Sequence, residues 1–154
     1  MSVPYKSSED SAVNMHDLIL NKEDVALLDQ YLTRYVEDTG VKLAILMNRD
    51  GHMLAHNGNI ASIDLFGLCA LSVGAFLSSE ALAQMTGEES FSTISHKGSR
   101  HNVFISAVGD NHLLLTIYDY NASEPLVRLQ AKVTAENIIG VLDRVLSNTV
   151  FPIR

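Results

Sequence analysis

The sequence predicts a domain of the α/β class, layered as α+β, in which helices cover both faces of a sheet. Three observations support this class. Apolar residues recur at helical spacing near both ends of the 154-residue chain. Residues 43–47 form a continuous apolar run, which is typical of a central strand covered on both faces. Three further strand-like runs follow a second helical stretch. The predicted order is therefore helix, two strands, helix, three strands, helix.

The first helix is expected to begin after Asn21, whose side chain can cap it. Glu23 and Asp24 complement the helix dipole in the first turn, and Gly40 supplies the C-terminal cap. The apolar positions recur at helical spacing, so one stripe of this helix is expected to be buried. That stripe contains Val25, Leu28, Leu32, Tyr35 and Val36.

A β-hairpin is expected next. Its strands cover residues 41–48 and 52–57, and the turn at residues 49–51 contains the Asp-Gly pair that favours a tight hairpin. Because the first strand is apolar at nearly every position, helices are expected on both sides of the sheet.

Residues 65–86 are the most informative stretch, a predicted helix in which Glu80 is the one charged residue. A broad face of large side chains is expected to pack on the protein's own core. Small residues occupy the opposite face, where an ordinary surface helix would carry charges. Because small residues let another backbone approach closely, a second protein is expected to cover this helix. The large face contains Leu65, Leu68, Leu71, Phe76 and Leu82, and the small face contains Gly67, Ala70, Gly74, Ser78 and Ala81.

Two alternatives compete with that interpretation. The helix could be buried on all sides of a monomer, but a chain of this size forms one modest domain in which most helices keep one face in water. It could also span a membrane, since its length suffices for a hydrocarbon core of roughly 30 Å. Glu80, Gln84, several serines and the lack of flanking Lys or Arg argue against a span.

Three strands are expected after Gly87, over residues 91–97, 101–108 and 112–118, with turns at Gly98 and Gly109. The first is mostly polar, as an edge strand would be, and the third is mostly apolar, as a central strand would be. A long helix is expected from about Ser123, with Pro125 in its first turn. Its buried stripe is expected to contain Leu126, Leu129, Val133, Ile138, Leu142 and Val145.

Composition narrows the choice of partners and compartment. The formal charge of −7 and the pI near 5.2 disfavour nucleic acid and anionic membranes, which both need a concentrated basic surface. The single cysteine, Cys69, lies in the apolar helix and is expected to be a buried thiol. These features predict a cytoplasmic protein without a cofactor. Residues 1–14 are rich in Ser, Glu, Asp and Pro and lack a signal-peptide core. This predicts a largely flexible tail at residues 1–20 before a single domain at residues 21–150.

The order of elements and the stretches VKLAILMNRDGHMLAHNG and LLLTIYD resemble the roadblock/dynein light chain family. Within this family the chain looks most like the bacterial MglB-type GTPase-activating proteins, over residues 16–146. Further points of match are the LAH at 54–56, the Thr86-Gly87-Glu88 after the small-residue helix, and His96-Lys97-Gly98. The resemblance implies a roadblock (profilin-like) fold. In this fold a five-stranded antiparallel sheet has the first and last helices on one face and the middle helix on the other.

The resemblance also implies a homodimer, formed through the middle helix and the third strand so that two sheets join edge to edge. In MglB-type proteins the paired middle helices contact a small Ras-like GTPase and accelerate GTP hydrolysis. The implied GTPase-contact positions are Ala70, Gly74, Leu77, Ser78 and Ala81, of which Leu77 is bulkier than the family pattern. The implied dimer-interface positions are Gly67, Leu71, Phe91, Thr93, Ile94 and Ser95.

The sequence offers little enzymatic chemistry. No GxxxxGK motif followed by Ser or Thr occurs, so the chain is not expected to be the GTPase itself. His52 and His56 would lie about 13 Å apart on an extended strand, too far to share one metal ion. Arg49 and Arg100 lie at turns, where solvated arginines are ordinary, and they are the candidates with the reach to enter a partner's active site. No catalytic or metal-binding residue is predicted.

Three functional hypotheses follow. The first is a homodimeric GTPase-activating protein for a small bacterial Ras-like GTPase, without an active site of its own, in cell polarity or motility. The second is a non-catalytic roadblock scaffold that assembles a multiprotein complex. The third is a small-ligand sensor, because a sheet flanked by helices can enclose a pocket. Stimulated GTP hydrolysis separates the first from the second, and a ligand-induced rise in melting temperature would favour the third.

Overall fold

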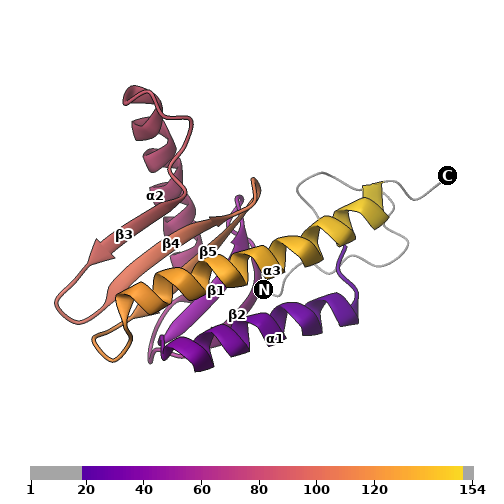
Figure 1. Ribbon diagram of the computed structural model, residues 1–154, viewed down its shortest axis with the longest axis horizontal. Helices are drawn as coiled ribbons and strands as arrows, with labels where there is room; N and C mark the ends of the chain where they lie inside the picture. Colours follow the sequence, from indigo (N-terminus) through magenta and orange to yellow (C-terminus); the bar gives the residue numbers. More distant parts are fainter. Residues whose placement is uncertain (1–18, 151–154) are drawn as a thin grey trace.

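The computed structural model describes residues 19–150, with side chains as far as Ser147. Most of the predicted N-terminal tail, residues 1–20, therefore lies outside the described residues. Helices and strands follow one another in the predicted order (Figure 1). The elements are α1 (Lys22–Thr39), β1 (Leu43–Asn48), β2 (Met53–Gly58), α2 (Leu65–Met85), β3 (Thr93–Lys97), β4 (Asn102–Val108), β5 (His112–Tyr118) and α3 (Glu124–Val150).

Helix α1 begins and ends where the sequence predicts. The Asn21 side chain accepts a hydrogen bond from the backbone N–H of Asp24 at 2.8 Å, and the Asp24 carboxylate accepts one from the N–H of Asn21 at 3.3 Å. This capping box satisfies two backbone donors that the first turn would leave unpaired. Gly40 ends the helix with a left-handed φ of +77°, which glycine adopts without strain. Leu28, Leu32 and Tyr35 are buried as predicted, whereas Val25 is exposed.

The five strands form one antiparallel sheet with the order β2-β1-β5-β4-β3. Strand β1 lies between β2 and β5, and all six of its residues are buried, which confirms the prediction of a strand covered on both faces. Strand β3 lies at one edge, also as predicted. It begins at Thr93 rather than at residue 91, so Phe91 precedes the strand.

Two cores separate the layers. Alternate residues of the central strands, such as Leu46 and Leu114, contact α1 and α3 on one face. Their neighbours, such as Ile45 and Leu115, contact α2 on the other. The hydroxyls of Tyr35 and Thr116 share a buried hydrogen bond of 2.7 Å that joins α1 to β5. Two helices on one face and one on the other are the layers that the family resemblance implies (Figure 1).

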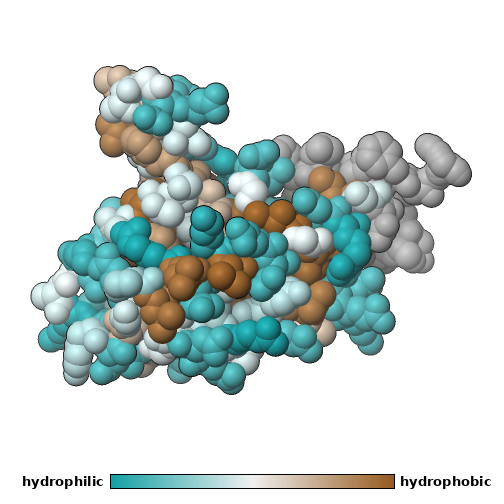
Figure 2. Space-filling model, viewed as in Figure 1, coloured by the Kyte–Doolittle hydropathy of each residue, from teal (hydrophilic) through white to brown (hydrophobic). Residues whose placement is uncertain are grey.

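The first half of α3 buries a different stripe from the one predicted. Leu126, Leu129 and Val133 are exposed, and 58% of the Leu129 surface is accessible to solvent. Apolar patches lie over this helix in Figure 2. The second half agrees with the prediction, because Ile138, Leu142 and Val145 are buried. The buried positions of the first half are Val127, Ala131, Thr134 and Ala135.

The rotation of α3 has a physical cause in its contacts. Small side chains at Ala131 and Ala135 let the helix lie close to the sheet. The buried face is therefore the one that allows the closest approach, and not the one with the largest side chains. Arg128 supports the same rotation, since its guanidinium lies 4.9 Å from the centre of the Phe104 ring and donates to the Ser95 hydroxyl at 2.8 Å. The helix is therefore held against β3 and β4 by a residue that periodicity does not reveal.

Candidate partner-binding site

Helix α2 is the element that the sequence singles out, and its termini agree with the prediction to within one residue. The Asp64 carboxylate accepts a hydrogen bond from the N–H of Gly67 at 3.0 Å and caps the helix. At the other end Thr86 follows the last helical residue, and Gly87 turns the chain with a φ of +85°. A Cβ at Gly67 would lie 2.5 Å from the Asp64 carboxylate, so this glycine has a local role at the cap.

The inner face of α2 is narrow. Cys69, Ser72, Phe76 and Ala83 are buried in a helix that runs from residue 65 to 85. Burial raises the pKa of the Cys69 thiol to about 11, so the thiol stays protonated at neutral pH. This agrees with the prediction of a buried thiol.

The prediction that Leu71 and Leu82 pack on the core is wrong. Both are exposed, Leu71 to 75% of its surface. At about 100° per residue, Leu71 and Leu82 lie more than a quarter turn away from Phe76. A single helix on a flat sheet cannot bury so wide an arc, and the close fit at Cys69 and Ser72 decides which arc faces inward.

The outer face of α2 carries the small residues that the sequence predicts there. Ala70, Gly74, Ser78 and Ala81 are exposed, and a Cβ built at Gly74 would meet no atom within 4 Å. Helical geometry places these small residues between exposed leucines, Leu77 on one side and Leu71 and Leu82 on the other. We refer to Ala70, Gly74, Leu77, Ser78 and Ala81 together with Leu71 and Leu82 as the α2 surface. Helical spacing assigns Leu71 and Leu82 to the core, whereas the family resemblance implies a partner contact at Leu77 and a dimer contact at Leu71.

The C-terminal half of α2 projects beyond the sheet (Figure 1). In Figure 2 a protrusion at this place carries apolar and weakly polar residues, with hydrophilic ones along one side. Exposed large apolar side chains along the helix include Phe66, Leu71, Leu77, Leu82 and Met85. Several large apolar side chains exposed on one helix are unusual for a monomeric protein, so α2 is the candidate interaction surface of the described chain.

The edge strand β3 offers a second surface. Strand β4 pairs with one side of β3. On the other side of β3 the backbone groups have no partner strand within the described sheet. Ile94 packs with the core under α2, so its side chain lies on the same face of the sheet as that helix. Thr93 and Ser95 are exposed and point to the other face. Phe91, expected at the dimer interface, is half-buried ahead of the strand.

Arg49 has a structural role that neither sequence-based interpretation foresaw. It is neither a solvated turn residue nor free to reach a partner, because its guanidinium contacts two other elements. One nitrogen donates to the carbonyl oxygen of Asp110 at 3.0 Å, and another forms an ion pair with Glu80 of α2. The guanidinium also lies 5.5 Å from the centre of the Phe76 ring. Arg100, the other candidate, is exposed.

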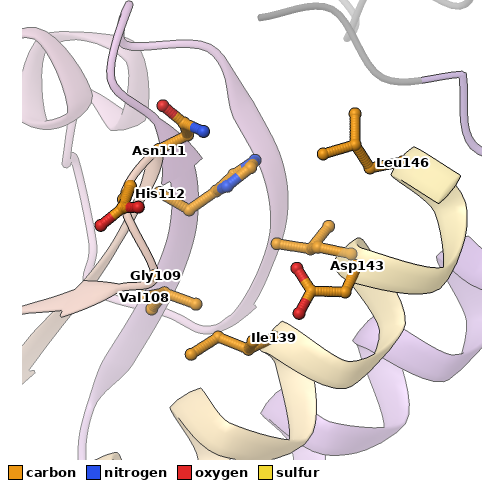
Figure 3. Close-up of a pocket in the computed structure, with 9 residues that line it drawn as sticks. Val108, Gly109, Asn111, His112, Ile139, Asp143 and Leu146 are labelled. Atoms are coloured by element: carbon orange, nitrogen blue, oxygen red, sulfur yellow. The ribbon is translucent and has the colours of Figure 1, made fainter. Parts of the chain in front are cut away.

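A small pocket lies on the opposite side of the sheet, between the β4–β5 turn and α3 (Figure 3). Its volume is about 60 Å³, well below the 300 Å³ or more of a typical ligand site. His112 lines it, and burial lowers the pKa of His112 from 6.5 to about 4. The pocket gives the ligand-sensor hypothesis little support.

Metal chemistry is not indicated within the described part of the chain. Residues 19–150 contain no group of three or more His, Cys, Asp or Glu placed to hold an ion. His96 pairs with Val103 in the β3–β4 register, so it does not face His101 across the turn.

The five-stranded antiparallel sheet with two helices on one face and one on the other is the layered fold of roadblock proteins. The Roadblock/LC7 domain family matches residues 27–119, and the chain belongs to this family. No protein with a curated description matches the chain at the sequence level.

Solved structures of MglB share the fold over nearly their whole length. Myxococcus xanthus MglB has 24% sequence identity and a TM-score of 0.77, with 83% of this chain and 96% of that chain covered. The gliding protein MglB from Thermus thermophilus has 26% identity and a TM-score of 0.77, covering 83% and 97%. An MglB with a tetrameric arrangement has 26% identity and a TM-score of 0.78, covering 84% and 98%.

Helix α2 is also long and apolar enough, by length and composition, to cross a membrane. One such helix is weak evidence for a membrane span, because the apolar helices of soluble proteins can have the same length and composition. In this structure the inner face of α2 packs on the sheet through Cys69 and Phe76.

Proposed function

We propose that the chain is a homodimeric GTPase-activating protein for a small bacterial Ras-like GTPase. The observation that carries the proposal is the α2 surface, an exposed helix face of small residues with leucine rims and little charge. Such a face suits close helix contact with another protein and would be unfavourable in water. The likeness to MglB structures supports the choice of partner class.

The proposed homodimer joins residues 21–150 of two copies, each taken as one roadblock domain, through α2 and the β3 edge. Burying three or four apolar side chains of the α2 surface would contribute ~1.5 to 3 kcal/mol each. Pairing β3 with its copy would satisfy the open backbone groups along Thr93–Lys97. Gly67, Leu71, Phe91 and the residues of β3 belong to the proposed interface.

The proposed mechanism is orientation of the GTPase's own groups. GTP hydrolysis needs an attacking water in line with the γ-phosphate and positive charge near the transition state. Arg49 is held by Glu80 and Asp110, so the proposal does not use it as an inserted arginine. The dimer would instead hold the switch loops of the GTPase in a productive geometry, and the chain would contribute no active site of its own. The setting we propose is cytoplasmic, in cell polarity or motility.

Single-turnover GTP hydrolysis tests this function. Each Ras-like GTPase encoded in the same genome is loaded with GTP, and hydrolysis is followed with and without the purified chain. We expect at least tenfold acceleration with one of them, which corresponds to about 1.4 kcal/mol of barrier. Tight binding without acceleration would contradict the activator role and favour a roadblock scaffold instead. The scaffold is the second candidate because the exposed α2 surface could hold another protein without changing the rate of any reaction.

A further inference from the structure

The outer half of α2 depends on few attachments. Of residues 81–85, Ala83 is buried and the other four are exposed. Further toward the N-terminus, Phe76 packs on the sheet and Glu80 is half-buried. Phe76 and Glu80 lie one helical turn apart on the same face and, with the buried Ala83, are the attachments that set the direction of the projecting segment.

Arg49 is the residue that holds this point. It follows β1, and its guanidinium lies over Phe76, forms the ion pair with Glu80 and donates to the Asp110 carbonyl in the β4–β5 turn. The backbone N–H of Arg49 donates to the Asn111 carbonyl at 3.1 Å, so the arginine is itself anchored to that turn. Three segments distant in sequence thus meet at one side chain.

The chemistry of this contact needs arginine. The planar guanidinium presents several N–H donors in fixed directions and can stack on an aromatic ring at the same time. A lysine could pair with Glu80, but it has no planar group to lie over Phe76 and no separate nitrogens to reach Glu80 and the Asp110 carbonyl at the same time. Arg49 and Glu80 are each about a quarter exposed, with 27% and 28% of their side-chain surface accessible, so water screens the pair only in part.

The contact between Arg49 and α2 lies near the middle of the helix, so a small change of angle there displaces the far end of the helix. From Phe76 to Met85 the helix rises about 14 Å, so a rotation of ~10° at Phe76 moves the tip by about 2 Å. Ser78 and Ala81 of the α2 surface lie on this outer segment. A partner that requires close helix contact would not tolerate such a shift.

We propose that Arg49 is a positioning residue, which fixes the angle of the outer half of α2 and so presents the α2 surface to the second copy in the homodimer. The inference rests on the proposed function, because it assumes that the α2 surface is where a second protein binds. Arg49 itself touches neither partner nor nucleotide in this account.

Hydrogen exchange and self-association of the purified chain test the proposal. The variants are Arg49→Gln, Arg49→Lys, Glu80→Gln and the double variant Arg49→Gln/Glu80→Gln. Arg100→Gln is the matched control, since it removes the same charge from an exposed turn arginine. Amide exchange is measured below and above the wild-type dimer dissociation constant, and that constant is measured by analytical ultracentrifugation.

We expect Arg49→Gln to raise exchange of the α2 amides from Leu77 to Met85 at least tenfold, with less than threefold change in β1 and β5. The double variant should exchange no faster than Arg49→Gln, because Arg49→Gln already breaks the ion pair that Glu80→Gln removes. Arg49→Lys should fall between Arg49→Gln and wild type. Self-association should weaken at least tenfold in Arg49→Gln and stay unchanged in Arg100→Gln.

Three results would overturn the proposal. The first is unchanged exchange in α2. The second is an equal rise across α2 and the central strands, which would make Arg49 an ordinary stabilising residue. The third is a loosened α2 with unchanged self-association. The exchange measurement uses no GTPase and does not need a dimer, so a chain that activates no GTPase would end the proposed function without deciding the role of Arg49.

Discussion

His112, a half-buried residue, makes the stability of the fold depend on pH. It begins β5 and lines the pocket under α3, together with Asp110 and Asp143 (Figure 3). Burial lowers its pKa from 6.5 to about 4. Between these two values the unfolded chain binds a proton at this residue and the folded chain does not. The free energy of unfolding therefore falls as the pH drops through that window.

We expect His112 to remove about 2 kcal/mol from the free energy of unfolding between pH 7 and pH 5. Urea unfolding of the wild type and of His112→Gln at both pH values checks this. The glutamine variant cannot take up the proton, so its stability should change less over the same interval. An equal loss of stability in the two proteins would contradict the assignment.

On the scale of single elements, α3 separates what periodicity predicts from what packing decides. Val127 is fully buried, whereas Leu129, two residues later, is mostly exposed. The sequence pattern favoured Leu129, because leucine is larger and continues the stripe of the second half. The observed inner face instead combines Val127 with alanines that let the helix approach the sheet.

The pair Val127→Ala and Leu129→Ala tests the observed rotation of α3. Val127→Ala should lower the free energy of unfolding by about 2 kcal/mol, because it leaves a cavity in the core. Leu129→Ala should change it by no more than about 0.5 kcal/mol, as expected for an exposed position. Chemical unfolding of the two variants gives both values. A larger loss of unfolding free energy in Leu129→Ala than in Val127→Ala would contradict the observed rotation and support burial of Leu129.

Local signals predicted much of the fold. The capping residues Asn21 and Gly40 define α1, and the apolar β1 implies helices on both faces. Such features depend on neighbours in sequence, so they can be recognised without the fold. The inner arcs of α2 and α3 depend on how a helix fits a twisted sheet, which no short pattern encodes.

The candidate site was predicted in part for the same reason. The small residues of α2 were placed correctly on its outer face, since helical spacing alone fixes their mutual arrangement. Leu71 and Leu82 were assigned to the wrong side. The role of Arg49 could not be predicted, because Glu80 and Asp110 lie 31 and 61 residues away and meet it only in the folded chain.

At the scale of the whole molecule, the two faces of the sheet are covered unequally. Helices α1 and α3 together close one face, whereas α2 alone covers the other and projects past it (Figure 1). The uncovered features are the α2 surface and the free side of β3, with Ile94 turned toward the α2 face. A second copy and a GTPase are the partners we propose for these surfaces.

Substitution of a single helical glycine tests most directly whether the α2 surface is the functional face. Gly74→Arg places a long charged side chain in the centre of that surface, and Gly140→Arg makes the same change at an open position of α3. Both should fold, since neither glycine needs a positive φ and neither Cβ would meet another atom within 4 Å. We expect Gly74→Arg to abolish self-association and GTPase binding while Gly140→Arg retains both. Unchanged binding by Gly74→Arg would contradict the account.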